Sequence, residues 1–321
     1  MGESDGNNVP TGSHRINYER DMIFSQQSPN NAPEQSLPTM PVDEIVAVTL
    51  TEQEFENLRK LVYDRFGIHL VPEKRTMVTV RLQKVLRRMG FKTFHEYYEY
   101  LIHSPSNEPL IEFANYITTN HTFFFREKEH FDYLVRYVLP EMSHSLKSRQ
   151  DFDFRVWCAG CSSGEEAYML AMLMMEFWGI EYSRWRAGVL ATDISERALT
   201  IAESGVYPDE RINLLPPEYK TKYFQRLPNN EWKVKPDLQK EVIFRKLNLM
   251  NQTFPFKKQF HVIFCRNVMI YFDKPTRDAL IKRFYDTLMP GGYLFIGHSE
   301  TIDRAHSDFQ YIMPALYKKP L

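Results

Sequence analysis

The run between Phe154 and Glu166 combines the residue types of a ligand-binding turn. It reads FRVWCAGCSSGEE: an apolar stretch typical of a strand, a turn of small residues, and two acids that begin a helical pattern. Gly160 and Gly164 allow a ligand to approach the backbone closely, but their spacing differs from the G-x-G-x-x-G of dinucleotide sites. Acids at a helix N-terminus suit the helix dipole and repel a pyrophosphate. The turn favours a cationic ligand without phosphate, such as S-adenosylmethionine (SAM); a tight turn that binds no ligand is the alternative.

Two cysteines in this run have the spacing of a metal or redox motif. Cys158 and Cys161 form C-x-x-C, but a zinc site needs a second ligand pair, and Cys265 is the only other cysteine. Two glutamates at the helix start would raise the thiol pKa and so oppose redox chemistry. We therefore predict small buried cysteines, no metal site, and the reduced thiols of a cytoplasmic protein.

Two later runs place polar residues where strands are expected to end. LATDIS ends a strand at Asp193, whose carboxylate can accept hydrogen bonds from both hydroxyls of a ribose. The alternative is that Asp193 caps the helix expected from Glu196, a position that Ser195 can also fill. At the same sheet edge, where α/β proteins bind ligands, the run FCRNVMIYF places Arg266, Asn267 and Tyr271.

These runs occur in the same order as the corresponding motifs of a known protein family. GCSSGEEAY, ATDIS, KLNL, FCRNVMIYF and PGGYLFIGHSE, preceded by TTNHTFFFRE, resemble the chemotaxis receptor methyltransferases of the CheR family over about residues 45–318. The resemblance implies transfer of a methyl group from SAM to glutamates on the cytoplasmic helical domain of chemoreceptors, which yields glutamyl methyl esters and S-adenosylhomocysteine. It implies cofactor contacts from Asn120, Thr122, Arg126, Glu165, Asp193, Asn248, Leu249, Cys265, Arg266 and Asn267.

The resemblance also assigns roles within this set. Glu165 would hold the methionine part of SAM, with Glu166 as second choice, Asp193 would bind the ribose, and Asn248 and Leu249 would flank the adenine. The catalytic residues would be Arg126 and Tyr271. A glutamate is already ionised at pH 7, so the reaction needs no general base. It needs alignment and desolvation of two opposite charges, and an arginine and a tyrosine can orient the carboxylate.

Alternation of strand and helix patterns after residue 150 predicts the fold that carries these runs. Strands are expected at 152–158, 188–192, 261–265 and 293–296, with helices at 165–178, 196–204 and 274–288. This order is typical of a doubly wound α/β sheet, here a Rossmann-like SAM-dependent methyltransferase domain over 136–321. Residues 206–247 interrupt the alternation, and we predict an inserted antiparallel β subdomain that contains the strands 231–234 and 242–244.

Residues 45–135 are predicted to form a helical receptor-recognition domain and a linker. Thr51 and Glu54 form a capping box, Gly67 ends that helix, and a second helix runs over 73–89 to Gly90. Between residues 57 and 95, ten basic residues against two acidic ones leave a surplus of eight positive charges. One face of the second helix is apolar, and beside it lies a basic ridge of Arg81, Lys84 and Arg88. The ridge is either a solvated surface or a docking surface for an acidic receptor helix.

The amino-acid composition argues against two other classes of protein, nucleic-acid binders and membrane-inserted proteins. The formal net charge of −1 argues against a general nucleic-acid binder, and no apolar stretch is long enough for membrane insertion. Residues 1–44, with seven acids and two bases, are predicted to be a disordered acidic tail. A non-catalytic SAM-binding signalling module and a methyltransferase for another substrate remain the alternatives.

The inserted subdomain departs from part of the family. Some members carry a glycine-rich turn there that holds a peptide at the receptor tail. The corresponding stretch 225–231 reads QRLPNNE and has no glycine. We therefore predict that the protein is not tethered through a receptor tail peptide.

Overall fold

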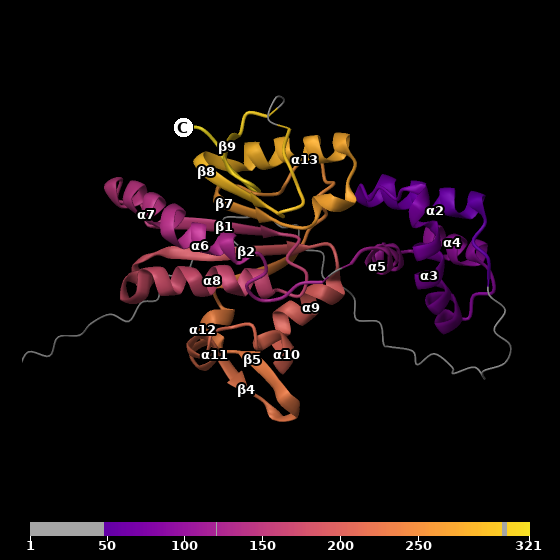
Figure 1. Cartoon of the computed structure of the whole chain (residues 1–321), viewed down its shortest axis with the longest axis horizontal. Helices are drawn as coiled ribbons and strands as arrows, with labels where there is room; N and C mark the ends of the chain where they lie inside the picture. The colour runs from indigo at the N-terminus through magenta and orange to yellow at the C-terminus, as the bar shows by residue number, and fades with distance from the viewer. Residues whose placement is uncertain (1–47, 120, 304–306) are drawn as a thin grey trace, which may run out of the picture.

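The computed structural model describes residues 48–119, 121–303 and 307–321. The predicted tail 1–44 and the predicted cofactor residue Asn120 lie outside the described residues. A helical region occupies one end of the molecule and a large sheet the other (Figure 1). None of the described helices is long and apolar enough to cross a bilayer.

The helical region consists of α2 (Glu52–Phe66), α3 (Arg75–Met89), α4 (Phe94–His103) and α5 (Glu108–Ile117). The predicted capping box of Thr51 and Glu54 is confirmed, and Gly67 and Gly90 end α2 and α3 in the left-handed conformation. The second helix was predicted from residue 73, but a 3₁₀ turn, Pro72–Lys74, precedes α3. Proline suits the first turn of a helix because its missing N–H would have no partner there.

A seven-stranded sheet forms the centre of the rest of the chain. Its order is β6-β2-β1-β7-β8-β10-β9. The parallel part contains β1 (Asp153–Ala159), β2 (Arg186–Asp193), β6 (Val242–Lys246), β7 (Phe260–Cys265) and β8 (Leu288–Ile296). The antiparallel hairpin β9 (Gln310–Met313) and β10 (Leu316–Lys318) completes one edge. The predicted doubly wound sheet is confirmed, and sheet order brings the ends of β1, β2 and β7 together.

Helices cover both faces of this sheet. On one face, α6 (Lys128–Tyr133), α7 (Leu139–Ser148), α8 (Glu165–Trp178) and α9 (Glu196–Ser204) share a core with alternate residues of the strands, such as Val156. On the other face, α13 (Lys274–Thr287) packs Phe284 against Trp157, with 5.4 Å between ring centroids. Phe131 of α6 already belongs to the sheet core, so the chain joins the sheet before residue 135.

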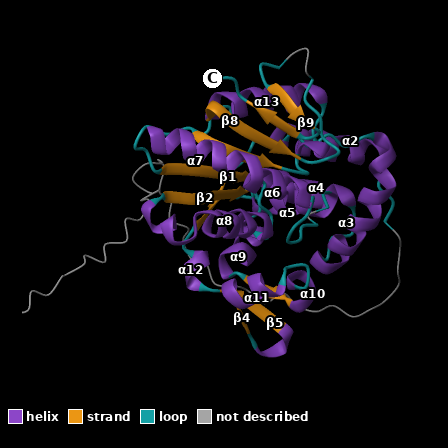
Figure 2. Cartoon of the chain, turned by 60° about the vertical axis from the view of Figure 1, so that its left-hand side comes forward, coloured by secondary structure: helices purple, strands orange, loops and turns teal. Residues whose placement is uncertain are grey.

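The inserted subdomain is smaller than predicted. Its sheet has the order β3-β5-β4, with β3 (Val206–Pro208), β4 (Phe224–Arg226) and β5 (Glu231–Val234), and lies below α8 (Figure 2). Three short helices accompany it: α10 (Asp209–Ile212), α11 (Pro217–Tyr223) and α12 (Pro236–Gln239).

The strand at 242–244 was wrongly placed in that subdomain. It is part of β6, which pairs in parallel with β2 from Val189↔Val242 onward. Phe244 packs on Tyr168 of α8 with 5.5 Å between ring centroids. Burial of these apolar side chains against α8 stabilises the strand at the edge of the main sheet.

Gly164, at the start of α8, allows a direct test of the packing between α8 and α9. A Cβ there would lie 2.8 Å from Cβ of Ala202, and φ is +93°. Gly90 has φ of +77° with no atom within 4 Å of such a Cβ. We expect Gly90→Ala to lower the free energy of unfolding by about 1–2 kcal/mol from backbone strain, and Gly164→Ala by about 2–4 kcal/mol because overpacking adds to it. Urea unfolding followed by circular dichroism measures both, and equal losses would contradict the packing argument.

Candidate functional site

A cavity opens where the helical region faces the carboxyl ends of β1, β2 and β7. Its walls come from segments far apart in the chain: the end of α5, the turn after β1, the end of β2 and the loop after β7. The structure brings to this cavity most of the residues predicted to bind cofactor or substrate: Thr122, Arg126, Asp193, Asn248, Leu249, Arg266, Asn267 and Tyr271.

The turn after β1 lines the cavity and is held against the end of β2. The backbone N–H groups of Gly160 and Cys161 donate to the carbonyl of Thr192 at 2.8 and 2.9 Å. A Cβ on Gly160, whose φ is +83°, would lie 2.4 Å from Cγ2 of Val268. Only glycine permits this close approach of Val268 to the turn without strain, so packing within the protein itself requires Gly160.

Asp193 stands at the end of β2 with its carboxylate at the cavity. Its two oxygens accept hydrogen bonds from the backbone N–H groups of Ser162 and Ser195, at 2.8 and 2.9 Å. The cap of α9 is Ser195, whose hydroxyl accepts from the N–H of Ala198, so Asp193 is not needed for capping. Burial raises the pKa of Asp193, and the backbone N–H groups oppose that rise. Because a carboxylate has about four lone-pair sites, acceptor capacity remains for two ribose hydroxyls.

The two acids that begin α8 have different surroundings. Glu165 is fully buried and accepts from the Ser163 hydroxyl at 2.7 Å and from Arg211, outside the cavity lining. Glu166 lines the cavity, where it accepts from Arg266 at 2.9 Å. Consecutive helical residues point about 100° apart, so one turn cannot direct both to the same place. The structure thus separates Glu165 from the cavity and places Glu166, the second choice of the sequence analysis, in its wall.

Cys265, also predicted as a cofactor contact, has its side chain in the core rather than in the cavity wall. It is fully buried at the end of β7, in the same apolar cluster as Met269 and Ile296. Burial raises its thiol pKa, as it does for Cys158 and Cys161. The alternation of side chains along a strand directs Cys265 to the face that α13 covers, and the next residue, Arg266, reaches the cavity.

Arg266 is a buried cation held between two carboxylates. Its Nη1 lies 2.9 Å from Oε2 of Glu166, and its Nη2 lies 3.1 Å from Oε2 of Glu127. The guanidinium also donates to the carbonyl of Arg126 and lies 5.2 Å from the ring centre of Phe131. Burial raises the pKa of Glu166, and Arg266 opposes that shift. The carboxylate of Glu166 remains in the cavity wall, where it can attract an ammonium group.

Tyr271 joins the two regions of the molecule at the cavity. Its hydroxyl donates to the carbonyl of Thr119 at 3.1 Å and accepts from the N–H of Thr119 at 2.8 Å. The N–H of His69 donates to the carbonyl of Tyr271 at 2.7 Å, and the amide of Asn248 donates to the carbonyl of Arg65 at 3.0 Å. The helical region is therefore part of the site.

Two acids that hold this site, Glu300 and Glu127, were assigned no role in the sequence analysis. Glu300 accepts from the N–H groups of Asn267 and Ile270 at 3.2 and 3.1 Å, and so positions the loop that carries Tyr271. Glu127 holds the turn that carries Arg126. Both acids lie inside the quoted motifs, at the ends of GHSE and TFFFRE, and that position was the available signal.

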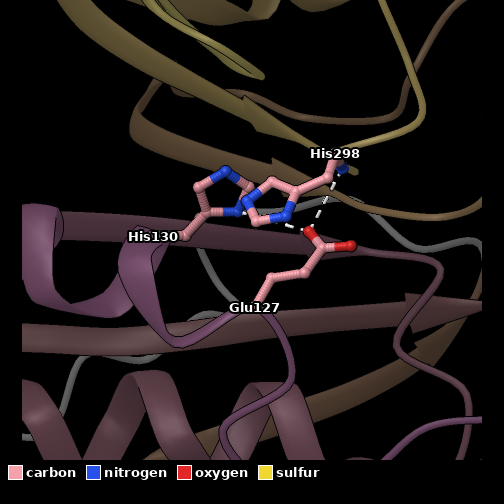
Figure 3. Close-up of side chains that lie close together, drawn as sticks. All are labelled: Glu127, His130 and His298. Carbon is pink, nitrogen blue, oxygen red and sulfur yellow. Dashed lines mark hydrogen bonds and ion pairs between the residues drawn. The ribbon is translucent and has the colours of Figure 1, made fainter.

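Glu127, His130 and His298 have the residue types of a metal centre, with one ligand atom of each within 4.8 Å of the others (Figure 3). However, Oε2 of Glu127 already accepts from Arg266 at 3.1 Å and from the N–H of His298 at 3.3 Å. A metal ion at this oxygen would have to displace a buried guanidinium. The geometry therefore favours a hydrogen-bonded clamp on Glu127.

The residues at the cavity fit SAM. Asp193 can accept from ribose hydroxyls, Glu166 can hold an ammonium, and neither requires a phosphate on the ligand. Asn248 and Leu249 also line the cavity, and the resemblance places the adenine between them.

The two glutamates of α8 give a matched test of this fit. We expect Glu166→Gln to weaken SAM binding by about 1.5–3 kcal/mol, since it removes a charge-assisted contact. Glu165→Gln is expected to keep SAM affinity and to lower stability, because it takes the carboxylate away from Arg211. Titration calorimetry with SAM and urea unfolding measure the two effects. Loss of affinity in the Glu165 variant alone would reverse the assignment.

Comparison with known proteins identifies the family of this chain. The CheR methyltransferase SAM-binding domain model matches residues 120–317, and the CheR all-alpha domain model matches residues 53–118. The chain is 46% identical to a chemotaxis protein methyltransferase of Borreliella burgdorferi, over 85% of this chain and 96% of that protein. It is 36% identical to the chemotaxis protein methyltransferase of Escherichia coli, over 82% of this chain and 89% of that protein. With both of its regions matched in order, the chain belongs to the CheR methyltransferase family.

Proposed function

We propose that the protein transfers the methyl group of SAM to glutamate side chains on the cytoplasmic helical domain of chemoreceptors. The observation that carries the proposal is one cavity lined both by the carboxylates of Asp193 and Glu166 and by Arg126 and Tyr271. The carboxylates suit the cofactor, and the arginine and tyrosine suit a carboxylate substrate. The names of the curated relatives support a role in chemotaxis.

The side chains act by binding and alignment. SAM, when bound, would supply a methyl group on its sulfonium. Attack of the glutamate oxygen on the methyl carbon forms the ester bond as the C–S bond breaks, and S-adenosylhomocysteine leaves as the thioether. Arg126 orients the glutamate carboxylate through its two parallel N–H donors. Tyr271 lines the cavity that the substrate glutamate would enter, and its two hydrogen bonds to Thr119 fix the orientation of its ring. The opposite charges of the reactants are lost as they react, so exclusion of water by the helical region favours the transfer.

Incubation with tritiated SAM and receptor-containing membranes tests the proposal. We expect base-labile label on a receptor-sized band, the property of a carboxyl methyl ester. Arg126→Lys and Tyr271→Phe are each expected to lower kcat more than they raise KM for receptor, because both residues act mainly in the transition state. Binding of SAM without any transfer would favour a non-catalytic signalling module. Label that resists base would indicate another type of substrate.

We also propose that α3 docks on the receptor, through fewer cations than the predicted ridge. Arg81 donates to the carbonyls of Tyr116, Ile117 and Thr118 at 3.1–3.2 Å. Arg88 pairs with Glu112 at 3.3 Å. Lys84 and its neighbour Arg87 are exposed and have no ion-pair partner among the described residues. They flank Val80, an apolar side chain that is 55% exposed, which suits an acidic helix with an apolar edge.

Charge reversal on this face tests the docking surface. We expect Lys84→Glu with Arg87→Glu to lower kcat/KM for receptor about tenfold or more at low salt, because complementary charge speeds association. Added salt should reduce the wild-type rate, since exposed charges are screened beyond about 8 Å. SAM affinity should be unchanged. The matched control, Arg136→Glu with Arg149→Glu, makes the same charge change on exposed residues near α7; equal rates in the two variants would exclude docking at α3.

We further propose that docking does not use a peptide at the receptor tail. The turn of the inserted subdomain contains Asn229 and Asn230, with φ of +65° and +58°, where a glycine-rich turn would expose more backbone. A receptor without its C-terminal tail, included in the same assay, should be methylated at the rate of the intact receptor. A slower rate would contradict this proposal, but it would not bear on the proposed docking at α3.

A further inference from the structure

The turn that carries Arg126 has an unfavourable backbone. Phe125 and Glu127, on either side of Arg126, have φ of +61° and +52°. Residues with a Cβ rarely adopt this left-handed conformation, and it persists only where surrounding contacts hold it. The contacts that hold this turn therefore set the direction in which the Arg126 side chain leaves the backbone, and a hydrogen bond from its guanidinium to the carbonyl of His121 holds its far end.

Those contacts converge on the carboxylate of Glu127, and Figure 3 shows the one from His298. Its Oε2 accepts from Nη2 and Nε of Arg266 at 3.1 and 3.3 Å and from the N–H of His298 at 3.3 Å. Its Oε1 accepts from the amide of Asn267 at 3.2 Å. The carboxylate thus connects the turn to the ends of both β7 and β8.

Arg266 holds the same turn at a second point, because its guanidinium also donates to the carbonyl of Arg126. The peptide between Arg126 and Glu127 is thereby held through its carbonyl and through the following side chain. Burial alone would raise the pKa of Glu127, but Arg266 and Asn267 outweigh burial and lower it. The carboxylate is therefore charged at neutral pH, as this clamp requires.

We infer that Glu127 is a positioning residue that directs Arg126 into the cavity, an inference that rests on the proposed function. The Arg126 side chain lines the cavity, whereas Glu127 is not among its lining residues and its side chain is only 14% exposed. Glu127 therefore acts on the position of Arg126 indirectly, through the peptide bond that joins the two residues. Its effect on the reaction should therefore depend on the presence of the Arg126 guanidinium.

A double-mutant cycle on the full chain tests this dependence. Glu127→Gln keeps the length of the side chain and removes its charge. We expect it to lower kcat for receptor methylation at least tenfold with Arg126 present and less than twofold in an Arg126→Ala background. Titration calorimetry should show SAM affinity of Glu127→Gln within threefold of wild type. Initial rates with tritiated SAM at saturating concentration provide kcat.

The matched control is Asp153→Asn. Asp153 is also a buried carboxylate paired with an arginine, Arg155 at 2.5 Å, but it lies at the opposite end of β1. It is expected to lower the melting temperature and to have the same effect on kcat in both backgrounds. This comparison separates positioning of Arg126 from general loss of stability.

Several outcomes would overturn the inference. Equal fold-losses from Glu127→Gln in the two backgrounds would show that Glu127 acts independently of Arg126, and a wild-type kcat would show that it does not act on the reaction. If the glutamine variant does not fold, Glu127→Gly replaces it, since glycine adopts the left-handed conformation without the carboxylate; a wild-type kcat there overturns the inference equally. A wild-type kcat in Arg126→Ala would instead overturn the role of Arg126 in the proposed function, and the inference with it.

Discussion

The buried guanidinium of Arg266 is the interaction on which the site depends. It follows β7 and binds the first turn of α8 through Glu166 and the turn before α6 through Glu127. Aromatic rings of Phe131 and Phe264 lie 5.2 and 6.0 Å from it, so water does not compete for its donors. A buried charge that loses a partner is strongly destabilising. The triad of Arg266, Glu166 and Glu127 therefore specifies one relative arrangement of three segments. Each of these segments contributes a residue to the cavity wall.

The helical region completes the site that this triad begins. Thr119 bonds the Tyr271 hydroxyl, and a backbone bridge joins Ile68 to Phe272. Arg81 of α3 holds the last carbonyls of α5, directly before the residues that line the cavity. A continuous set of contacts therefore runs from the face of α3 to the cofactor cavity. In the function we propose, receptor docking and methyl transfer share this framework.

Local patterns accounted for most of the fold. The capping box at Thr51, the glycine ends of α2 and α3, and the alternation that forms the parallel sheet are all set by neighbours within a few residues. Sheet topology then carries the motif residues to one edge, since parallel strands end together. The strand at Val242 was misplaced because an apolar run of that length does not say which of two sheets it joins.

The sequence by itself determined the order of the elements, the chemistry of the motifs and the edge at which they meet, because hydrophobic periodicity and capping act over short distances. Only the tertiary structure decided which acid faces the cavity, since Arg211 draws Glu165 away and Arg266 holds Glu166. It also decided which cations of α3 are bonded within the protein, because the partners of Arg81 and Arg88 come from α5 and the residues just after it, 24 to 38 residues further along the chain. Such choices depend on contacts between distant segments, and no local pattern encodes them.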